Sequence, residues 1–124
     1  MASATVTGVK PVNSASAGDG DYAIITWALT TADHTGDSIA YPDYADRTAQ
    51  FISSSWGAAT ASIEGSLDGG TTWFILTDPQ GNVISKTADG GEAVTEAVPL
   101  IRARLTVVGA GAVVTVKLYV RKAK

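Results

Sequence analysis

Residues 50–76 constrain the fold most, because they combine strand-like alternation with glycine turns. Over residues 60–67, small or apolar side chains take every second position and polar ones take most of the rest. This period is typical of a half-buried β-strand. Asp68-Gly69-Gly70 tolerates positive φ, and the aromatic run 73–76 follows directly. We therefore expect a tight hairpin at the centre of a β-sandwich.

The last two strands show the clearest alternation in the sequence. Residues 100–108 and 113–121 each have one aliphatic face and one polar or basic face. Because Gly109-Ala110-Gly111-Ala112 joins them, we expect a C-terminal hairpin with a basic outer face and an aliphatic inner one. Patterns rich in β-branched and aromatic residues, bounded by turn residues, predict further strands at 22–30, 38–41, 47–53, 83–86 and 93–98.

The chain of 124 residues has the length of one domain and no segment with a helical period. Short strands at this spacing predict an all-β fold, a single β-sandwich with the jelly roll as the expected topology; a Greek-key variant with an immunoglobulin-like strand order stays open. Residues 1–20 are rich in Ala, Ser, Thr and Gly. We expect them to form an extended N-terminal arm, or a frayed terminus, beside a sandwich domain of residues 21–124.

The composition narrows the classes of function. There is no cysteine, so disulfides, thiolate catalysis and Cys-ligated metals are excluded. A net charge of −3 argues against nucleic acid as the partner, and no apolar stretch approaches the ~20 residues of a membrane span. All 12 acidic residues lie at or before Glu96, whereas six of the nine basic residues follow Val98. The charge is thus divided between the two ends of the sequence.

No residue pattern predicts catalysis or a cofactor. His34, the only histidine, lies in a Thr/Asp/Gly loop without a nucleophile elbow. Four aspartates nearby match no calcium-binding loop, and Gly109-Ala110-Gly111 lacks the third glycine of a dinucleotide fingerprint. We expect no enzyme activity, no cofactor and no metal.

Four motifs resemble those of a known family. Trp56 opens a W-G-x-A-T pattern, a strand then ends in G-S-x-D-G at residues 65–69, and T-x-W and D-x-x-G follow at 71–73 and 78–81. With the closing basic strand, this series resembles small capsid decoration (cement) and head proteins of tailed bacteriophages, over roughly the last three quarters of the chain.

The resemblance implies a non-enzymatic virion protein, made in the host cytoplasm, that binds the outer surface of a phage head and bridges capsid subunits. Its implied partners are the major capsid protein and copies of itself, as a homotrimer; many weak copies then stabilise the shell together. We expect the arm and the basic C-terminal face to make the contacts. The candidate interface residues are Arg102, Arg104, Lys117, Tyr119, Arg121, Val6, Val9 and Val12.

Two alternatives stay open. The basic outer face has a self-paired reading, in which it forms ion pairs with acids on an adjacent strand of its own sheet. The chain also has the features of a carbohydrate-binding module or receptor-binding tip, because glycine turns of this kind recur in sugar-binding sandwiches. In that reading Tyr41, Tyr44 and Trp56 form an exposed aromatic platform.

Overall fold

The computed structural model describes residues 1–9, 22–40 and 44–122. The prediction of an all-β chain is confirmed, because the described residues form nine strands and no helix. The strands are β1 (Ala4–Val9), β2 (Tyr22–Thr30), β3 (Tyr44–Ser55), β4 (Thr60–Ser66), β5 (Phe74–Ile75), β6 (Ser85–Lys86), β7 (Gly90–Val94), β8 (Leu100–Val107) and β9 (Val113–Lys122).

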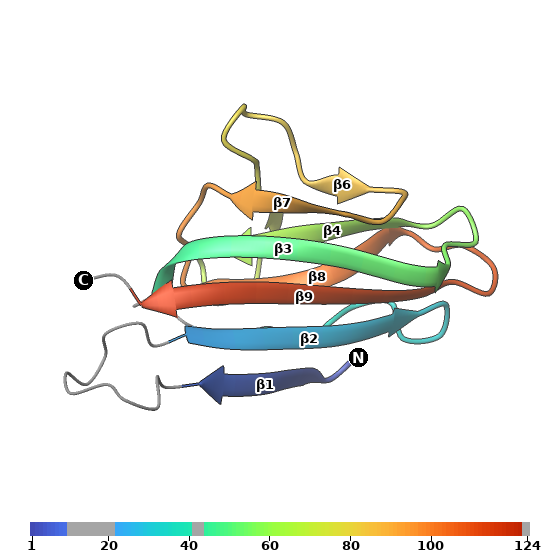
Figure 1. Ribbon diagram of the computed structural model, residues 1–124, viewed down its shortest axis with the longest axis horizontal. Coiled ribbons are helices and arrows are strands. Elements are labelled where there is room, and N and C mark those ends of the chain that lie inside the picture. The colour runs from blue at the N-terminus through green and yellow to red at the C-terminus, as the bar shows by residue number, and fades with distance from the viewer. Residues whose placement is uncertain (10–21, 41–43, 123–124) are drawn as a thin grey trace.

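Two antiparallel sheets form the sandwich (Figure 1). The first has five strands in the order β1-β2-β9-β3-β7. In the second, β4 is central; β8 pairs along one edge, and β5 and β6 share the other. Figure 1 shows β2, β9 and β3 crossing the view side by side, with β8 and β4 in the layer behind them.

The strand pairs are nested in the sequence. β2 pairs with β9 along its whole length, and β3 pairs with β7. Residues 35–39, which lie between β2 and β3 in the sequence, form two antiparallel bridges to β8, at Thr35 with Arg104 and at Ile39 with Ile101. β4 pairs with β5 and β6, which follow it directly. The pairs β2 with β9, residues 35–39 with β8, and β3 with β7 thus enclose one another in the sequence, with β4, β5 and β6 innermost.

The core lies between the two sheets and follows the predicted alternation. On β2, every second residue from Ala23 to Leu29 is buried, and β9 and β8 repeat this pattern. Trp27 is fully buried, and its Nε1 donates a hydrogen bond to the Asp37 carbonyl oxygen at 2.8 Å. Burying each large aliphatic or aromatic side chain stabilises the fold by roughly 1.5–3 kcal/mol. The core therefore ties both sheets together without any disulfide.

The predicted C-terminal hairpin is wrong. β9 pairs with β2 and β3 in the first sheet, whereas β8 pairs with β4 in the second. The aliphatic faces of β8 and β9 pack toward each other across the core, so residues 108–112 form an arch between the sheets. Thr31 holds this arch, because its Oγ1 donates to the Gly109 carbonyl at 2.6 Å and accepts from the Ala112 amide at 3.1 Å.

The central hairpin is confirmed, but its connection is longer than the tight turn we expected. β4 and β5 pair at Glu64 with Ile75 and at Gly65 with Phe74, so residues 67–73 form the loop. Asp68 organises it: one carboxylate oxygen accepts hydrogen bonds from the amides of Thr71 and Thr72. A single side chain thus stabilises a wider loop than a two-residue turn.

Three short strands differ from their predicted bounds. Of the strand predicted at 38–41, the described residues 38–40 contribute only the bridge at Ile39, and the strand predicted at 83–86 is reduced to β6. The strand predicted at 93–98 begins earlier, because Gly90 and Gly91, expected in a turn, pair beside Phe51 and Gln50 of β3. Sheet pairing here overrides the local preference of glycine for turns.

The N-terminal segment contributes a strand to the first sheet. β1 pairs antiparallel with β2 from Ala4 opposite Trp27 to Val9 opposite Tyr22. Before it, Ala2 is buried, and its amide donates to the Thr35 carbonyl oxygen at 2.8 Å. Residues 10–20 of the expected arm lie outside the described residues.

Candidate functional site

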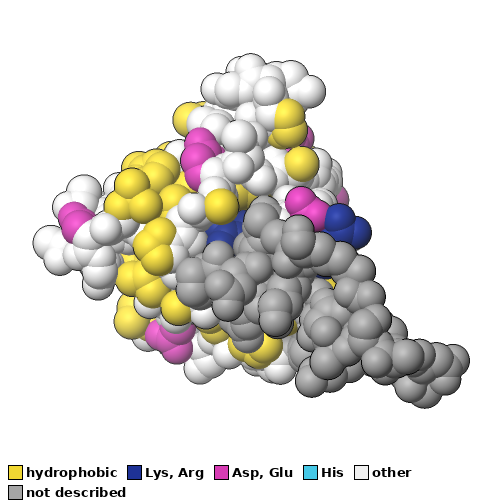
Figure 2. Space-filling view, turned by 90° about the vertical axis from the view of Figure 1, so that its left-hand side faces the viewer, with side chains coloured by type: hydrophobic (Ala, Val, Ile, Leu, Met, Phe, Trp, Pro, Cys, Tyr) yellow, Lys and Arg dark blue, Asp and Glu magenta, His cyan; other side chains and the backbone are white. Residues whose placement is uncertain are grey.

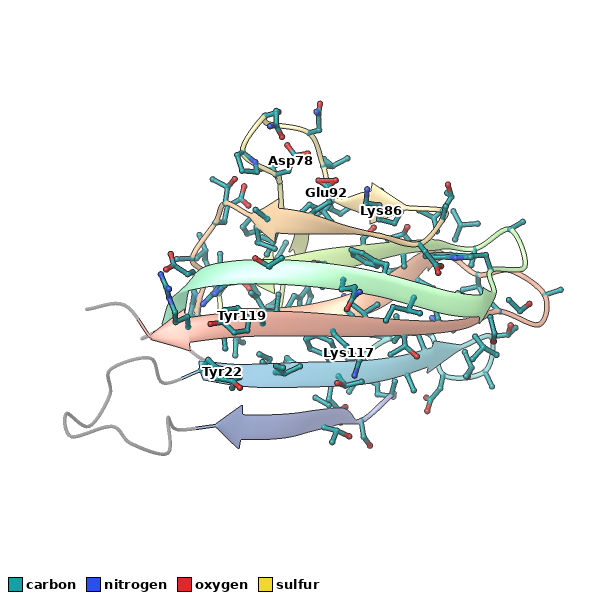
Figure 3. All side chains as sticks on the ribbon, viewed as in Figure 1. Tyr22, Asp78, Lys86, Glu92, Lys117 and Tyr119 are labelled. Carbon is teal, nitrogen blue, oxygen red and sulfur yellow. The ribbon has the colours of Figure 1, made fainter. Side chains whose placement is uncertain are left out.

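The outer face of the first sheet is a candidate surface for binding. The register places Lys117 of β9 between Thr26 of β2 and Gln50 of β3. Two residues further along β9, Tyr119 is likewise flanked by residues of β2 and β3. In Figure 3, Tyr22, Lys117 and Tyr119 lie along this part of the sheet. Because side chains alternate along a strand, all of these point away from the core.

This face contains a hollow of about 520 Å³, which we call the sheet hollow. Its lining crosses four strands: Ile24, Thr48, Ala49, Gln50, Gly90, Gly91, Lys117 and Tyr119. The two glycines of β7 carry no side chain that would fill the space beside Gln50. The volume falls in the range of small-molecule sites.

An aromatic pair and a cation mark the hollow. The rings of Tyr119 and Tyr22 stand with centroids 5.3 Å apart at 34°, a tilted contact that fixes the Tyr119 ring. The Lys117 Nζ donates to the Thr26 hydroxyl at 3.3 Å. No ion pair of Lys117 is formed within the described part of the chain. A positive charge therefore lies in an otherwise neutral hollow.

The other predicted basic residues do not join Lys117. Arg102 and Arg104 lie on β8 in the second sheet, where both pair with the Glu64 carboxylate at 2.9 and 3.2 Å. The Arg102 guanidinium also lies 4.1 Å from the centre of the Trp73 ring. Arg121, on β9, pairs with Asp46 at the end of the first sheet. The division of charge along the sequence thus produces no single basic face.

For β8, the self-paired alternative is the one the structure shows. Glu64 is only 4% exposed, and its two arginine partners lie on the adjacent strand of its own sheet. A buried carboxylate between two cations neutralises much of their charge. Arg102 and Arg104 are accordingly part of the structure of the second sheet.

The predicted valines have different positions. Val6 lies in β1 opposite Ile25 and is 44% exposed, because β1 is the outermost strand of its sheet. Val9 is the last residue of β1. Val12 lies outside the described residues.

Two residues of the predicted sugar platform, Tyr44 and Trp56, lie far apart along the first sheet. Tyr44 begins β3, whereas Trp56 follows the other end of the same strand. At about 3.3 Å per residue, their Cα atoms are separated by roughly 35–40 Å. Trp56 is half-buried, and its Nε1 donates to the Asp89 carboxylate at 2.9 Å. Tyr41 lies outside the described residues.

Hydrophobic side chains gather at the end of the sandwich shown in Figure 2. Leu67 and Phe74, at the two ends of the β4–β5 loop, are both exposed and flank a smaller hollow with Asp68 and Thr72. Hydrogen bonds from the Thr72 amide and the Ser66 hydroxyl lower the pKa of Asp68 to about 2. The carboxylate therefore stays charged and keeps the loop in place at neutral pH.

Sequence reasoning found Lys117 and Tyr119 but missed the rest of the hollow. Ile24, Thr48 and Gln50 sit in predicted strands, and alternation alone places them outward. Their meeting around one space depends on the β2-β9-β3-β7 order, for which no local pattern exists. Gly90 and Gly91 were the only sequence signal of the hollow, since a glycine inside a strand has no side chain to pack and often marks a position that a ligand or another backbone approaches closely.

Chemically, the arrangement is suited to binding. Within the described residues, no group of acidic or histidine side chains is placed to hold a metal ion, and none of the structure is a helix able to cross a membrane. His34 is exposed, and its ring Nδ1 lies 3.4 Å from the Thr35 hydroxyl.

A scan against protein-family models found no match, and a search of curated proteins found no relative.

Proposed function

We propose that this chain is a capsid decoration protein, which binds the outer surface of a phage head and bridges its subunits through the edge strand β1. The sequence motifs described above support the class of protein. The observation that carries the mode of binding is the edge of β1. Among the described residues, β2 is the only strand paired with β1. The edge of β1 that faces away from β2 therefore presents backbone donors and acceptors.

Monomeric proteins normally protect an exposed edge strand of this length against pairing with another chain. β1 has no charged residue, carries the half-exposed Val6 and spans six residues. Adding a strand from a neighbouring chain satisfies the backbone groups and covers the valine. The neighbour is either the major capsid protein or another copy of this chain, as a trimer at a three-fold position of the shell. Many copies then stabilise the head without a tight single site.

We also propose that the sandwich is a jelly roll. The support is the nested pairing, in which β2 pairs with β9, residues 35–39 with β8, β3 with β7, and β4 with β5 and β6. This is the arrangement obtained when a long hairpin is rolled into two sheets. Jelly rolls are common in capsids and in sugar-binding domains, so the topology is compatible with both classes of function.

The test is co-sedimentation with heads assembled from the major capsid protein of the same genome. Val6→Lys puts a charge at the edge strand and should abolish binding to the heads. Val83→Lys is the matched control, because Val83 is 58% exposed and lies away from β1, between β5 and β6. Urea unfolding of both variants checks that the sandwich remains intact. Equal binding by Val6→Lys and the unchanged chain would rule out the β1 edge.

Light scattering tests the trimer separately. A mass of about three times the 12.7 kDa chain supports self-association at the proposed three-fold position. If Val6→Lys converts such a trimer into a monomer, the covering neighbour is another copy of the chain. If the trimer persists while binding to the heads is lost, the covering neighbour is the capsid protein.

A further inference from the structure

The sheet hollow has polar groups without partners as well as a cation. The Gln50 amide and the Thr48 hydroxyl make no hydrogen bond within the described part of the chain, and the Lys117 ammonium has only the Thr26 hydroxyl. All three side chains converge on one space of about 520 Å³. The hollow therefore offers hydrogen-bond donors and acceptors that are aimed at a ligand position.

Tyr119 and Ile24 form the apolar part of the lining on one side of the hollow. The Tyr119 ring is held by its contact with Tyr22 at 5.3 Å, and Ile24 stands opposite Tyr119 on the neighbouring strand. A fixed aromatic ring next to neutral hydrogen-bonding groups suits a ligand with an apolar face and hydroxyl edges. Sugar rings have this form, because their C–H groups gather on one face and their hydroxyls point outward.

Lys117 adds a charge preference. The described residues that line the hollow include no acid, so the ammonium has no carboxylate of its own chain to neutralise it there. Its charge complements an anionic ligand, and the chain's net charge of −3 makes such a local cation distinctive. Phosphate sites usually have several donors that converge on one position, such as arginines or a cluster of backbone amides. Lys117 is the only cation among the described residues that line the hollow, so a carboxylate suits this site better than a phosphate.

A peptide fits this surface less well than a sugar. The strands β2, β9 and β3 each have a paired strand on both sides, so their backbone groups around the hollow are already used in the sheet ladder and a peptide backbone would find few partners over them. The hydroxyls of a sugar need only the side-chain groups that the hollow provides. Gly90 and Gly91 leave the β7 side open, which gives a chain of sugars room to continue across the sheet.

We propose that the sheet hollow binds an acidic oligosaccharide, with a sugar ring on Tyr119, its hydroxyls on Gln50 and Thr48, and its carboxylate on Lys117. This site uses the outer face of the first sheet, whereas the decoration function uses the free edge of β1, so neither depends on the other. A chain that fails to bind heads can still bind sugar, and the reverse also holds.

The experiment is a titration of the ¹⁵N-labelled chain, followed by amide chemical shifts. The probes are trigalacturonate, a hyaluronan hexasaccharide and 3′-sialyllactose, with fully methyl-esterified trigalacturonate as the neutral match and an acidic hexapeptide as the other ligand class. We expect at least one acidic sugar to give saturable shifts confined to the hollow. Saturation by the peptide with none by the sugars, or no saturation by any acidic sugar, would overturn the proposal.

Variants separate the roles of the lining residues. Lys117→Gln should weaken binding of the acidic sugar about ten-fold, because it replaces a charge-assisted hydrogen bond with a neutral one. Lys117→Arg should restore most of it, and Tyr119→Ala should weaken acidic and esterified sugars alike. Arg121→Gln is the matched control, since it removes one positive charge from the same strand outside the hollow. Equal effects of Lys117→Gln and Arg121→Gln would contradict a specific role for Lys117.

Discussion

Gly109 packs directly against Gly57, so that a Cβ atom built on Gly109 would lie 1.8 Å from the Gly57 carbonyl oxygen. This contact joins the arch between β8 and β9 to the turn between β3 and β4. Because the opposing atoms belong to the backbone, they have little freedom to move aside. The absence of a side chain at Gly109 thus determines how closely the two connections approach.

Gly109→Ala should therefore destabilise the fold by at least about 3 kcal/mol, the upper range for forced overpacking. Gly111→Ala, in the same arch, is the control. Gly111 has a φ of 69° but nothing within 4 Å of the added Cβ, so only backbone strain of about 1–2 kcal/mol is expected. Urea unfolding measures both. A loss for Gly109→Ala no larger than that for Gly111→Ala would contradict the close contact.

The Glu64 pairs should be worth more than the other ion pair of the C-terminal strands. Glu64→Gln leaves Arg102 and Arg104 without their shared carboxylate, in a site where Glu64 is 4% exposed. We expect a loss of about 2 kcal/mol, reduced from the usual value for buried pairs because the arginines are partly solvated. Asp46→Asn breaks the exposed pair with Arg121 and should leave the stability almost unchanged, because solvent screens this pair. Similar losses in the two variants would show that burial does not strengthen the Glu64 pairs.

Much of the fold could be predicted because the long strands carry their own signal. Alternation located β2 at its observed bounds and the inward faces of β8 and β9. Alternation does not say which strand is the neighbour, however, and the glycine-rich link between β8 and β9 suits an arch as well as a hairpin. This ambiguity misplaced Arg102 and Arg104 on one face with Lys117. It also concealed the sheet hollow, whose lining comes from four strands distant in sequence.

The Asp68 carboxylate should titrate well below an ordinary aspartate. Hydrogen bonds from Thr72 and Ser66 favour its charged form and lower its pKa to about 2 from the usual 3.8. Since the folded pKa lies below the unfolded one, the contribution to stability is complete above about pH 4 and is lost as the pH falls through about 2. Carboxyl ¹³C NMR on the folded chain measures the midpoint. A midpoint near 4 would mean that the loop hydrogen bonds do not hold in solution.

Trp27 should matter more to stability than Trp73, although both indoles donate a hydrogen bond to a carbonyl oxygen. Trp27 is fully buried, and Trp27→Phe leaves the Asp37 carbonyl without this donor and opens space in the core. We expect a loss of about 2–3 kcal/mol, whereas Trp73→Phe, at a half-buried ring beneath Arg102, should lose about 1 kcal/mol. Tryptophan fluorescence gives a second readout: only Trp27→Phe should remove the blue-shifted emission of an indole shielded from water. If Trp73→Phe is the more damaging change, or if the blue-shifted emission survives in Trp27→Phe, the indole at the centre of the core is not Trp27.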